Sequence, residues 1–307
     1  MTSRAMSCLL FLLICAPLRS SDWLTYRECA ISNAESIRQF DVLFVVEQFN
    51  SDDEKRIKRK TRLALDFDLN QCVCFDVQEF EDGTIPGEPK VITLSKVLIF
   101  DAKSGVSRRF PEGVSDTVDN LFLTLGAILK VADLRCVGLG RFPETFTFGQ
   151  QLGCFDRCVR DRAIFPQSSK DLGTRENVVQ NRNYVRVLFT TDKVEQRYDF
   201  DGKTSMPTAI STYLGAINQR QLFSEQTFSW KEMDGLHLPV SVLVNSVKKR
   251  GDLGIVVREE FHSAQMHWFT VNQPLDRELL NVGRQGGLPM LMKLVDPAAS
   301  GADTLLK

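Results

Sequence analysis

Residues 62–69, Arg62-Leu63-Ala64-Leu65-Asp66-Phe67-Asp68-Leu69, place an apolar side chain at every second position. Successive side chains of a β-strand point to opposite faces, so the leucines and the phenylalanine of this stretch share one face. Arg62, Asp66 and Asp68 fall on the other face. Such alternation is typical of an antiparallel strand with one face against the core and the other in solvent. The sequence therefore predicts a half-buried strand here.

The same two-residue period recurs on both sides of this stretch within the first 110 residues. β-Branched and aromatic residues dominate these segments, as they do in strands. Four further strands are predicted, at Phe40–Phe49, Cys72–Val77, Val91–Phe100 and Val106–Phe110. A helix is expected before them at Asp22–Gln39, with Tyr26, Ala30 and Ile37 near one stripe.

A basic run, Lys55-Arg56-Ile57-Lys58-Arg59-Lys60, follows the acidic residues Asp52-Asp53-Glu54. Dense charge of both signs between two strand patterns indicates a solvated hairpin tip. A docking spot for anionic lipid or a protein partner is the alternative.

The middle of the chain changes to a helical period. Ser115 can cap a helix whose apolar residues recur with helical spacing, at Val118, Leu121, Phe122, Leu125, Ile128 and Leu129. Pro143 can open a second helix with a stripe made of Phe148, Leu152, Phe155 and Val159. We therefore predict a helical insertion at about residues 115–162, followed by a polar loop at Ser168–Asn183.

From Tyr184 onward the two-residue period returns. The predicted strands are Tyr184–Phe189, Val194–Phe200, Thr208–Leu214, Gln226–Glu232, Leu238–Val247, Gly254–Phe261 and Met266–Val271. Turn signals separate several of them, including Asp201-Gly202 and Asp234-Gly235. A short helix is expected at Pro274–Val282, and residues 283–307 are predicted to be a frayed C-terminal tail.

Two blocks of strands with helices in front and between predict an α+β fold. Sequential strands usually pair, so a meander is the default order, and a sheet of many twisted strands tends to curl. We expect one domain over residues 22–282: a long, curved antiparallel sheet, or open half-barrel, with helices packed in its concave face. Two packed subdomains divided near residue 170 are the alternative.

The N-terminal residues differ from the rest of the chain. Arg4 precedes an uncharged apolar run, Cys8–Leu18, which is too short to cross a bilayer of about 30 Å. Residues 1–20 therefore resemble a signal peptide with cleavage near Ser20 or Ser21, and an uncleaved anchor or a buried helix is the alternative. Lipidation at Cys15 is disfavoured, because Ile14 stands where a small residue is required. We expect export to the periplasm or cell envelope.

The charge balance bears on the class of partner. Removing residues 1–20, which hold Arg4 and Arg19 and no acid, leaves 36 basic against 39 acidic side chains and a net charge of −3. Nucleic-acid binders normally carry an excess of basic residues, so we do not expect this protein to bind nucleic acid. Any contact with a membrane is expected to be peripheral at most.

The cysteines and carboxylates offer few metal-binding patterns. Outside the signal segment the cysteines are Cys29, Cys72, Cys74, Cys136, Cys154 and Cys158, with no C-x2-C pair among them. We therefore predict buried thiols or one or two long-range disulfides rather than a zinc site. Asp66, Asp68 and Asp76 could bind Ca²⁺ if clustered, but solvated strand faces explain them more simply.

Catalytic motifs are scarce. The sequence has no G-x-S-x-G, H-E-x-x-H, P-loop or G-x-G-x-x-G pattern, and its three histidines are His237, His262 and His267. An odd spacing on a strand sends His262 and His267 to opposite faces unless Ser263-Ala264-Gln265 forms a turn. In that case both could meet Glu260 in one pocket. We expect no enzyme, no cofactor and no metal.

The apolar residues are more informative than the polar ones. If the strands and the inserted helices share one interior, their large side chains either fill a core or line a cavity for an apolar ligand. The residues that would line such a cavity are Phe44, Leu65, Phe67, Phe75, Leu98, Phe100, Leu121, Phe122, Leu125, Phe148, Leu152 and Phe189.

The order of these elements resembles the bacterial lipoprotein-carrier and lipoprotein-receptor superfamily. The resemblance rests on the leading helix, the strands at Phe40–Phe49, Arg62–Leu69 and Val91–Phe100, the helical interlude and the second run of strands. The stretches Trp230-Lys231-Glu232-Met233-Asp234-Gly235-Leu236-His237-Leu238-Pro239-Val240 and Trp268–Asp276 are also similar to exported proteins of unknown function in planctomycete-type bacteria. The superfamily implies an unclosed β-barrel lidded by helices.

The function expected from these observations is a non-enzymatic envelope protein that binds an apolar ligand in a half-barrel cavity. Such a ligand would be a lipid, an acyl chain or a lipidated peptide, and each buried CH₂ would contribute about 0.8 kcal/mol. An envelope scaffold with a filled core, which contacts a protein partner through loops or sheet edges, is the alternative.

Overall fold

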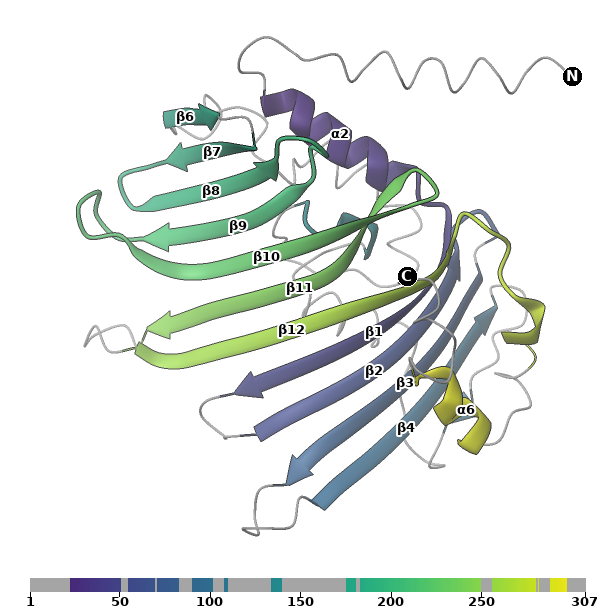
Figure 1. Cartoon of the computed structure of the whole chain (residues 1–307). Helices are drawn as coiled ribbons and strands as arrows, with labels where there is room; N and C mark the ends of the chain where they lie inside the picture. The colour runs from purple at the N-terminus through teal and green to yellow at the C-terminus, as the bar shows by residue number, and fades with distance from the viewer. Residues whose placement is uncertain are drawn as a thin grey trace, which may run out of the picture.

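The computed structural model of the chain describes residues 23–50, 55–69, 71–82, 90–101, 108–109, 134–139, 175–180, 183–249, 256–279, 281 and 288–296. These residues form one large, unclosed antiparallel sheet with few helices, so the fold is mostly β (Figure 1). The expected signal peptide and both helices of the insertion lie outside the described residues.

The first half of the sheet consists of strands joined by consecutive antiparallel pairing. They are β1 (Gln39–Asn50), β2 (Lys55–Asp66), β3 (Gln71–Asp82), β4 (Lys90–Asp101) and the two-residue β5 (Arg108–Arg109). Each neighbour along the chain is also the neighbour in the sheet, as the alternating segments predict.

The second half is another consecutive run. It contains β6 (Arg175–Gln180), β7 (Tyr184–Thr190), β8 (Val194–Asp201), β9 (Pro207–Leu214), β10 (Gln221–Met233), β11 (Leu236–Lys249) and β12 (Val256–Val271). The predicted hairpin between β7 and β8 is confirmed.

The two halves meet at the middle of the sheet, where β1 pairs with β12 from Phe40 opposite Val271 to Asn50 opposite Glu260. The strand order is therefore β5-β4-β3-β2-β1-β12-β11-β10-β9-β8-β7-β6. A simple meander would have placed β5 beside β6, and that expectation is wrong. β5 and β6 instead form the two edges, and both blocks belong to one sheet because the first and last strands pair.

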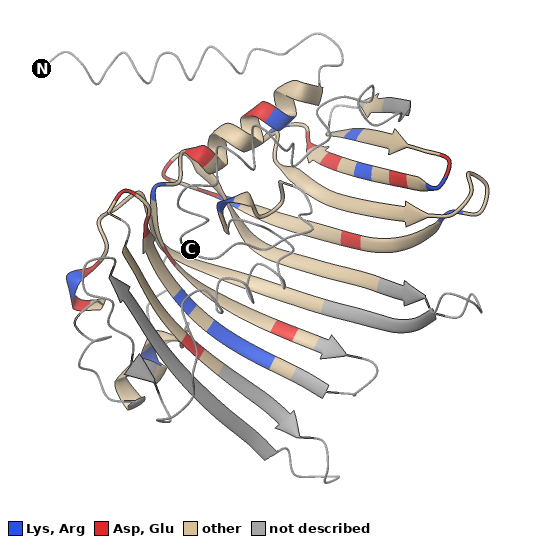
Figure 2. Cartoon of the chain, turned by 180° about the vertical axis from the view of Figure 1, so that it is seen from behind, with Lys and Arg blue, Asp and Glu red and all other residues tan. Residues whose placement is uncertain are grey.

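Three predicted boundaries also differ from the structure. Lys55–Lys60 is not a hairpin tip but the first half of β2, and two of its charged residues, Lys58 and Arg59, pair with acidic residues of the neighbouring strands β1 and β3 (Figure 2). Lys58, for example, lies opposite Glu47 with 3.5 Å between Nζ and Oε1. The predicted strands Gly254–Phe261 and Met266–Val271 are one continuous strand, β12. Arg175–Gln180, predicted to be loop, forms β6.

Helix α2 (Trp23–Glu35) and the short helix η1 (Leu134–Cys136) pack on the inner side of the curved sheet (Figure 1). Asn33 docks α2 on β11: its side-chain amide donates to the carbonyl of His237 at 2.7 Å and its Oδ1 accepts from the His237 N–H at 2.8 Å. The helix residues that join the inner core are Trp23, Ala30, Ile31 and Ala34. The predicted leading helix is thus confirmed.

The outer side of the first half has its own smaller core. Its strand residues are Leu43, Ala64, Val73, Phe75 and Val77, and they pack with Leu279 and Val295. Helix α6 (Leu288–Leu294) lies on this side, within the segment predicted to be a frayed tail (Figure 1). The predicted half-buried strand is therefore buried on both faces, since Thr61 to Asp66 are all buried.

Candidate functional site

The inner face of the sheet brings together several of the predicted cavity residues. Phe44, Leu65 and Phe189 are at most 2% exposed and belong to the inner core, and Phe67 packs against it from the turn after β2. Phe189 contacts Trp23 of α2 edge to face, with ring centroids 5.4 Å apart. Residues from both halves of the chain therefore share one apolar face.

Phe75 does not lie on this face. It is opposite Arg62 in the register of β2 and β3, and it belongs to the outer core together with Ala64 and Val73. Its neighbours Cys72 and Cys74 are the inner residues of β3, so the alternation that puts them inside turns Phe75 outward. The prediction that Phe75 lines the cavity is therefore wrong.

The remaining candidates fall on the part of the chain whose side chains are not described. Leu98 and Phe100 occupy register positions opposite Cys74 and Cys72. The other candidates come from the predicted helical insertion and lie outside the described residues. They are Leu121, Phe122, Leu125, Phe148 and Leu152.

A row of uncharged polar residues crosses the inner face of the second half, which the sequence patterns do not reveal. Gln196, Thr212, Ser224 and Ser246 are direct cross-strand neighbours on β8, β9, β10 and β11. Gln226, two residues after Ser224, lies on the same face. We call these five residues the polar band. Ser224, Gln226 and Ser246 are buried, with exposed fractions of 6%, 4% and 8%.

Two further polar groups continue along the inner face toward the first half. Gln48 of β1 and His262 of β12 are cross-strand neighbours, and the Gln48 amide nitrogen lies 3.0 Å from His262 Nδ1. Beyond them, Arg59 donates two hydrogen bonds to Asp76, at 2.7 and 2.6 Å, while the Thr61 hydroxyl donates to Asp76 Oδ1 at 2.7 Å.

This arginine–carboxylate pair is buried, because the side chains of Arg59 and Asp76 are 9% and 2% exposed. A bidentate pair satisfies the geometry of both groups and cancels their charges. A buried ion pair offsets a large desolvation cost, so each partner depends strongly on the other. The expectation that Asp76 lies on a solvated strand face is wrong.

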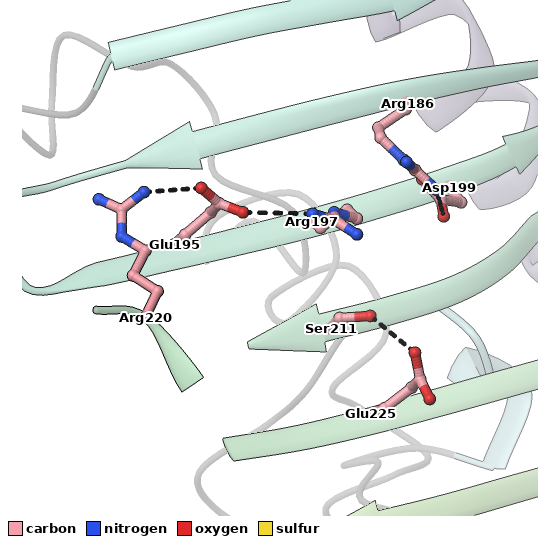
Figure 3. A network of polar contacts seen from close by, with 7 residues as sticks. All are labelled: Arg186, Glu195, Arg197, Asp199, Ser211, Arg220 and Glu225. Carbon is pink, nitrogen blue, oxygen red and sulfur yellow. Dashed lines mark hydrogen bonds and ion pairs between the residues drawn. The ribbon is translucent and has the colours of Figure 1, made fainter. Parts of the chain in front are cut away.

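The outer face of β7 to β10 carries a different kind of network (Figure 3). Glu195 binds two arginines, Arg220 at 2.6 Å and Arg197 at 3.5 Å, and Arg186 pairs with Asp199 at 2.6 Å. The side chain of Arg186 remains 34% exposed. The side chains of Glu195, Arg197, Asp199 and Arg220 are 11–28% exposed, so positive and negative groups alternate here in a partly buried network.

The histidines do not converge. β12 is continuous from Val256 to Val271, so Ser263–Gln265 forms no turn. His262 is opposite Val244 of the inner core, whereas His267 is opposite Leu43 of the outer core, and the two rings point to opposite sides. Within the described residues, no group of three or more His, Cys, Asp or Glu is placed to hold a metal ion.

The described cysteines are thiols rather than disulfides. Cys72, Cys74 and Cys136 are completely buried in the inner core, and Cys29 is half-buried. Burial raises the pKa of both Cys72 and Cys74, because a thiolate in an apolar interior loses its hydration. These thiols therefore act as small core residues. Cys154 and Cys158 lie outside the described residues.

The W-x-x-x-D-G-x-x-x-P stretch has a structural explanation. Asp234 and Gly235 form the two-residue turn between β10 and β11, with φ of 51° and 77°, as a type I′ hairpin requires. The Trp230 indole donates to the Pro207 carbonyl at 2.5 Å, and the Trp268 indole donates to the Pro239 carbonyl at 2.7 Å. These residues fix neighbouring strands to one another at the end of the sheet near α2.

Among the described residues, none of the helices has both the length and the apolar composition that a membrane-spanning segment requires.

No protein-family model matches this chain, and no curated protein matches it. Among solved structures, a DUF1329 family protein from Desulfovibrio piger is similar, with 10% sequence identity over 84% of this chain and 96% of that chain and a TM-score of 0.34. The Pseudomonas aeruginosa MucA/MucB complex gives 9% identity over 78% of this chain and 93% of that chain, with a TM-score of 0.19. Both likenesses are too distant to bear on the site or on a ligand.

Proposed function

We propose that this chain is an exported, non-enzymatic protein of the cell envelope that binds an apolar ligand against the inner face of its half-barrel. The ligand class is a lipid, an acyl chain or a lipidated peptide. The observation that carries the proposal is that apolar side chains from both strand blocks, from Phe44 on β1 to Phe189 on β7, share one inner face. A curved sheet with such a face is a common frame for a hydrophobic ligand site.

The proposal includes the helical insertion. The chain between β5 and β6 has to connect the two opposite edges of the sheet. Its apolar stripes, at Leu121–Leu129 and Phe148–Phe155, need an apolar surface to cover. That the insertion is helical and supplies the other wall of the ligand site stays a prediction from the sequence, because these residues lie outside the described residues.

Binding can be tested on the full-length protein without its signal segment, purified from an expression host. Organic extraction followed by mass spectrometry should recover lipid, and the delipidated protein should take up a fluorescent fatty acid with saturation. A clean apo mass together with no uptake would contradict the proposal.

A matched pair of variants localises the ligand. Ile210→Trp adds bulk on the inner face, where Ile210 is 5% exposed, and Leu222→Trp adds the same bulk at a position that is 37% exposed. We expect only the first to reduce uptake, with circular dichroism confirming that both variants fold. Equal uptake by both variants would place the ligand elsewhere.

A scaffold with a filled core is the second candidate. It is favoured by one observation: Phe44, Leu65 and Phe189 are at most 2% exposed in the chain alone, which is the packing of an occupied core. In that case neither extraction nor titration would find a ligand, and the sheet edges at β5 and β6 would be the surfaces for a partner.

A further inference from the structure

The hairpin that joins β9 to β10 differs from the neighbouring turns in its charge. Its residues, Leu214-Gly215-Ala216-Ile217-Asn218-Gln219-Arg220-Gln221-Leu222, include one charged side chain, and we call them the hairpin tip. The two preceding turns, at Asp192-Lys193 and Asp201-Gly202-Lys203, each carry an acid and a base. The tip also projects beyond the turn between β7 and β8 (Figure 1). Solvated turns are normally polar or charged, so this tip is a candidate contact surface.

Apolar side chains lie on both faces of the hairpin tip and at its apex. Leu214, Ile217 and Leu222 are 40%, 59% and 37% exposed. Leu214 follows Thr212 by two positions and shares its inner face, whereas Leu222 lies opposite Tyr213, on the outer face. Ile217 lies between them in the turn. The tip therefore exposes apolar surface in opposite directions.

The single charge of the hairpin tip is directed back toward the sheet. The Arg220 guanidinium donates to Glu195 Oε2 at 2.6 Å and to the Thr191 carbonyl at 2.7 Å (Figure 3). The Gly215 N–H donates to the carbonyl of Lys193 at 2.9 Å. These hydrogen bonds anchor the tip to the turn between β7 and β8, and they leave the outward surface of the tip uncharged.

The size and shape of this surface favour a lipid bilayer over a protein partner. Three partly exposed side chains provide far less area than the roughly 800 Å² that each partner buries in a standard protein interface. A protein surface would also cover only one of the two faces of the hairpin. A bilayer surrounds an inserted tip on every side without a matching shape. The amides of Asn218, Gln219 and Gln221 can form hydrogen bonds with lipid head groups at the membrane surface.

We propose that the hairpin tip inserts into the head-group region of a lipid bilayer and holds the protein at the membrane surface. Insertion is shallow, because the backbone groups of an open turn cannot leave water for hydrocarbon without losing their hydrogen bonds. The uncharged tip requires no anionic lipid, so a bilayer of phosphatidylcholine is sufficient. The inference goes beyond the proposed function, since this contact does not depend on a ligand in the half-barrel.

Co-sedimentation with phosphatidylcholine vesicles tests the inference on the full-length protein without its signal segment. We expect a saturable bound fraction that changes little with salt, because no charge of the tip takes part. Ile217→Asp puts a charge at the apex and should weaken vesicle binding at least about tenfold. Leu69→Asp is the matched control, because Leu69 is 62% exposed and lies in the turn after β2, at the opposite end of the sheet. Its vesicle binding should stay at the wild-type level, with circular dichroism confirming that both variants fold.

Two milder variants test whether both faces of the hairpin enter the bilayer. Leu214→Ser removes apolar surface from the inner face of the tip, and Leu222→Ser removes it from the outer face. Each should weaken vesicle binding about threefold, because a bilayer contacts both side chains. A loss confined to one of the two variants would indicate a one-sided contact and would overturn insertion.

The remaining outcomes separate this inference from its alternatives. If the wild-type protein does not bind vesicles, or if Ile217→Asp binds them as well as the wild type, the membrane contact is overturned. If analytical ultracentrifugation instead finds a wild-type dimer that Ile217→Asp dissociates, the tip contacts a second copy of the chain, and the inference is likewise overturned. Vesicle binding without fatty-acid uptake would overturn only the proposed function, and uptake without vesicle binding would overturn only this inference.

Discussion

The outer faces of the two halves of the sheet differ, although both halves are built from alternating antiparallel strands. In the first half, β1 to β3 carry Leu43, Val73 and Phe75 outward, and a C-terminal segment including Leu279 and Val295 covers them. In the second half, β7 buries only every second residue, and the outer face carries ion pairs whose side chains are 11–34% exposed. The strands of the first half are therefore covered by apolar residues on both faces. The strands of the second half are covered on the inner face and partly exposed on the outer face.

Arg62 shows how the covered face accommodates charge. It donates two hydrogen bonds to Asp41, at 3.0 and 2.7 Å, and its guanidinium lies 4.1 Å from the centre of the Phe269 ring. Its third contact, 3.4 Å to the carbonyl of Leu294, reaches α6. The C-terminal segment is thus bound to the outer face of the first half by apolar packing and also by the hydrogen bond from the buried Arg62 to Leu294.

The largest expected effect concerns the buried ion pair of the first half. Asp76→Ala leaves Arg59 charged and buried, and should lower the free energy of unfolding by about 3–5 kcal/mol. Asp199→Ala leaves Arg186, whose side chain is 34% exposed and reaches solvent, and should therefore cost less, about 1 kcal/mol. Urea unfolding measures both.

A double variant sharpens this comparison. Arg59→Met combined with Asp76→Leu replaces the pair by apolar groups and should recover most of the loss, because the uncompensated charge is gone. Equal losses for Asp76→Ala and Asp199→Ala would show that the two halves tolerate broken ion pairs alike, against the difference in their burial.

An intermediate effect is expected from apolar residues on the two outer faces. Leu43 is completely buried under the C-terminal cover, so Leu43→Ala should cost about 3 kcal/mol through lost burial and the cavity left behind. Leu188 is an outer residue of β7 and only half-buried, and Leu188→Ala should cost less than about 1 kcal/mol. Thermal and urea unfolding of the two variants compare the faces directly, and similar losses would contradict the described cover.

The smallest effect is in pH dependence, where an aspartate from each half shifts in the opposite direction. Burial raises the pKa of Asp41 above 3.8 and outweighs the hydrogen bonds and charge of Arg62. Burial also acts on Asp201, but hydrogen bonds from the N–H groups of Thr204 and Lys203 and from the Thr204 hydroxyl hold its pKa below 3.8.

The two shifts predict opposite contributions to stability. The contribution of Asp41 is complete below its unfolded pKa of 3.8 and is lost as the pH rises through its higher folded pKa. The contribution of Asp201 is present above 3.8 and is lost as the pH falls through its lower folded pKa. NMR titration of the two carboxyl carbons checks the order, and an Asp201 that titrates above Asp41 would refute it.

Local patterns predicted most of the strands, but they failed where a segment depends on a distant partner. Lys55–Lys60 has the composition of a solvated turn, yet it is a strand because Glu47 and Asp76 on neighbouring strands offset its charges. The prediction that Phe75 lines the inner face is wrong, because Cys72 and Cys74 on the same strand point inward and Phe75, one residue further on, points outward. β6 lacks an apolar alternation that would distinguish it from a loop.

The candidate site was predictable only in its apolar part. The alternation of β1, β2 and β7 identifies Phe44, Leu65 and Phe189 as inward residues, because the period of two is a local property. The polar band was missed, since its members belong to four different strands and become neighbours only through the register of β8 to β11. No spacing within one segment could have revealed it.

The sequence by itself determined the two blocks of alternating strands, the leading helix and the Asp234-Gly235 turn, because each depends on side-chain period or backbone conformation over a few residues. The pairing of β1 with β12, the placement of β5 and β6 at opposite edges and the second core under α6 were decided by the tertiary structure alone. The physical reason is that strand order and burial of a second face depend on contacts between residues more than 200 positions apart, such as Phe40 and Val271, which leave no periodic trace in the chain.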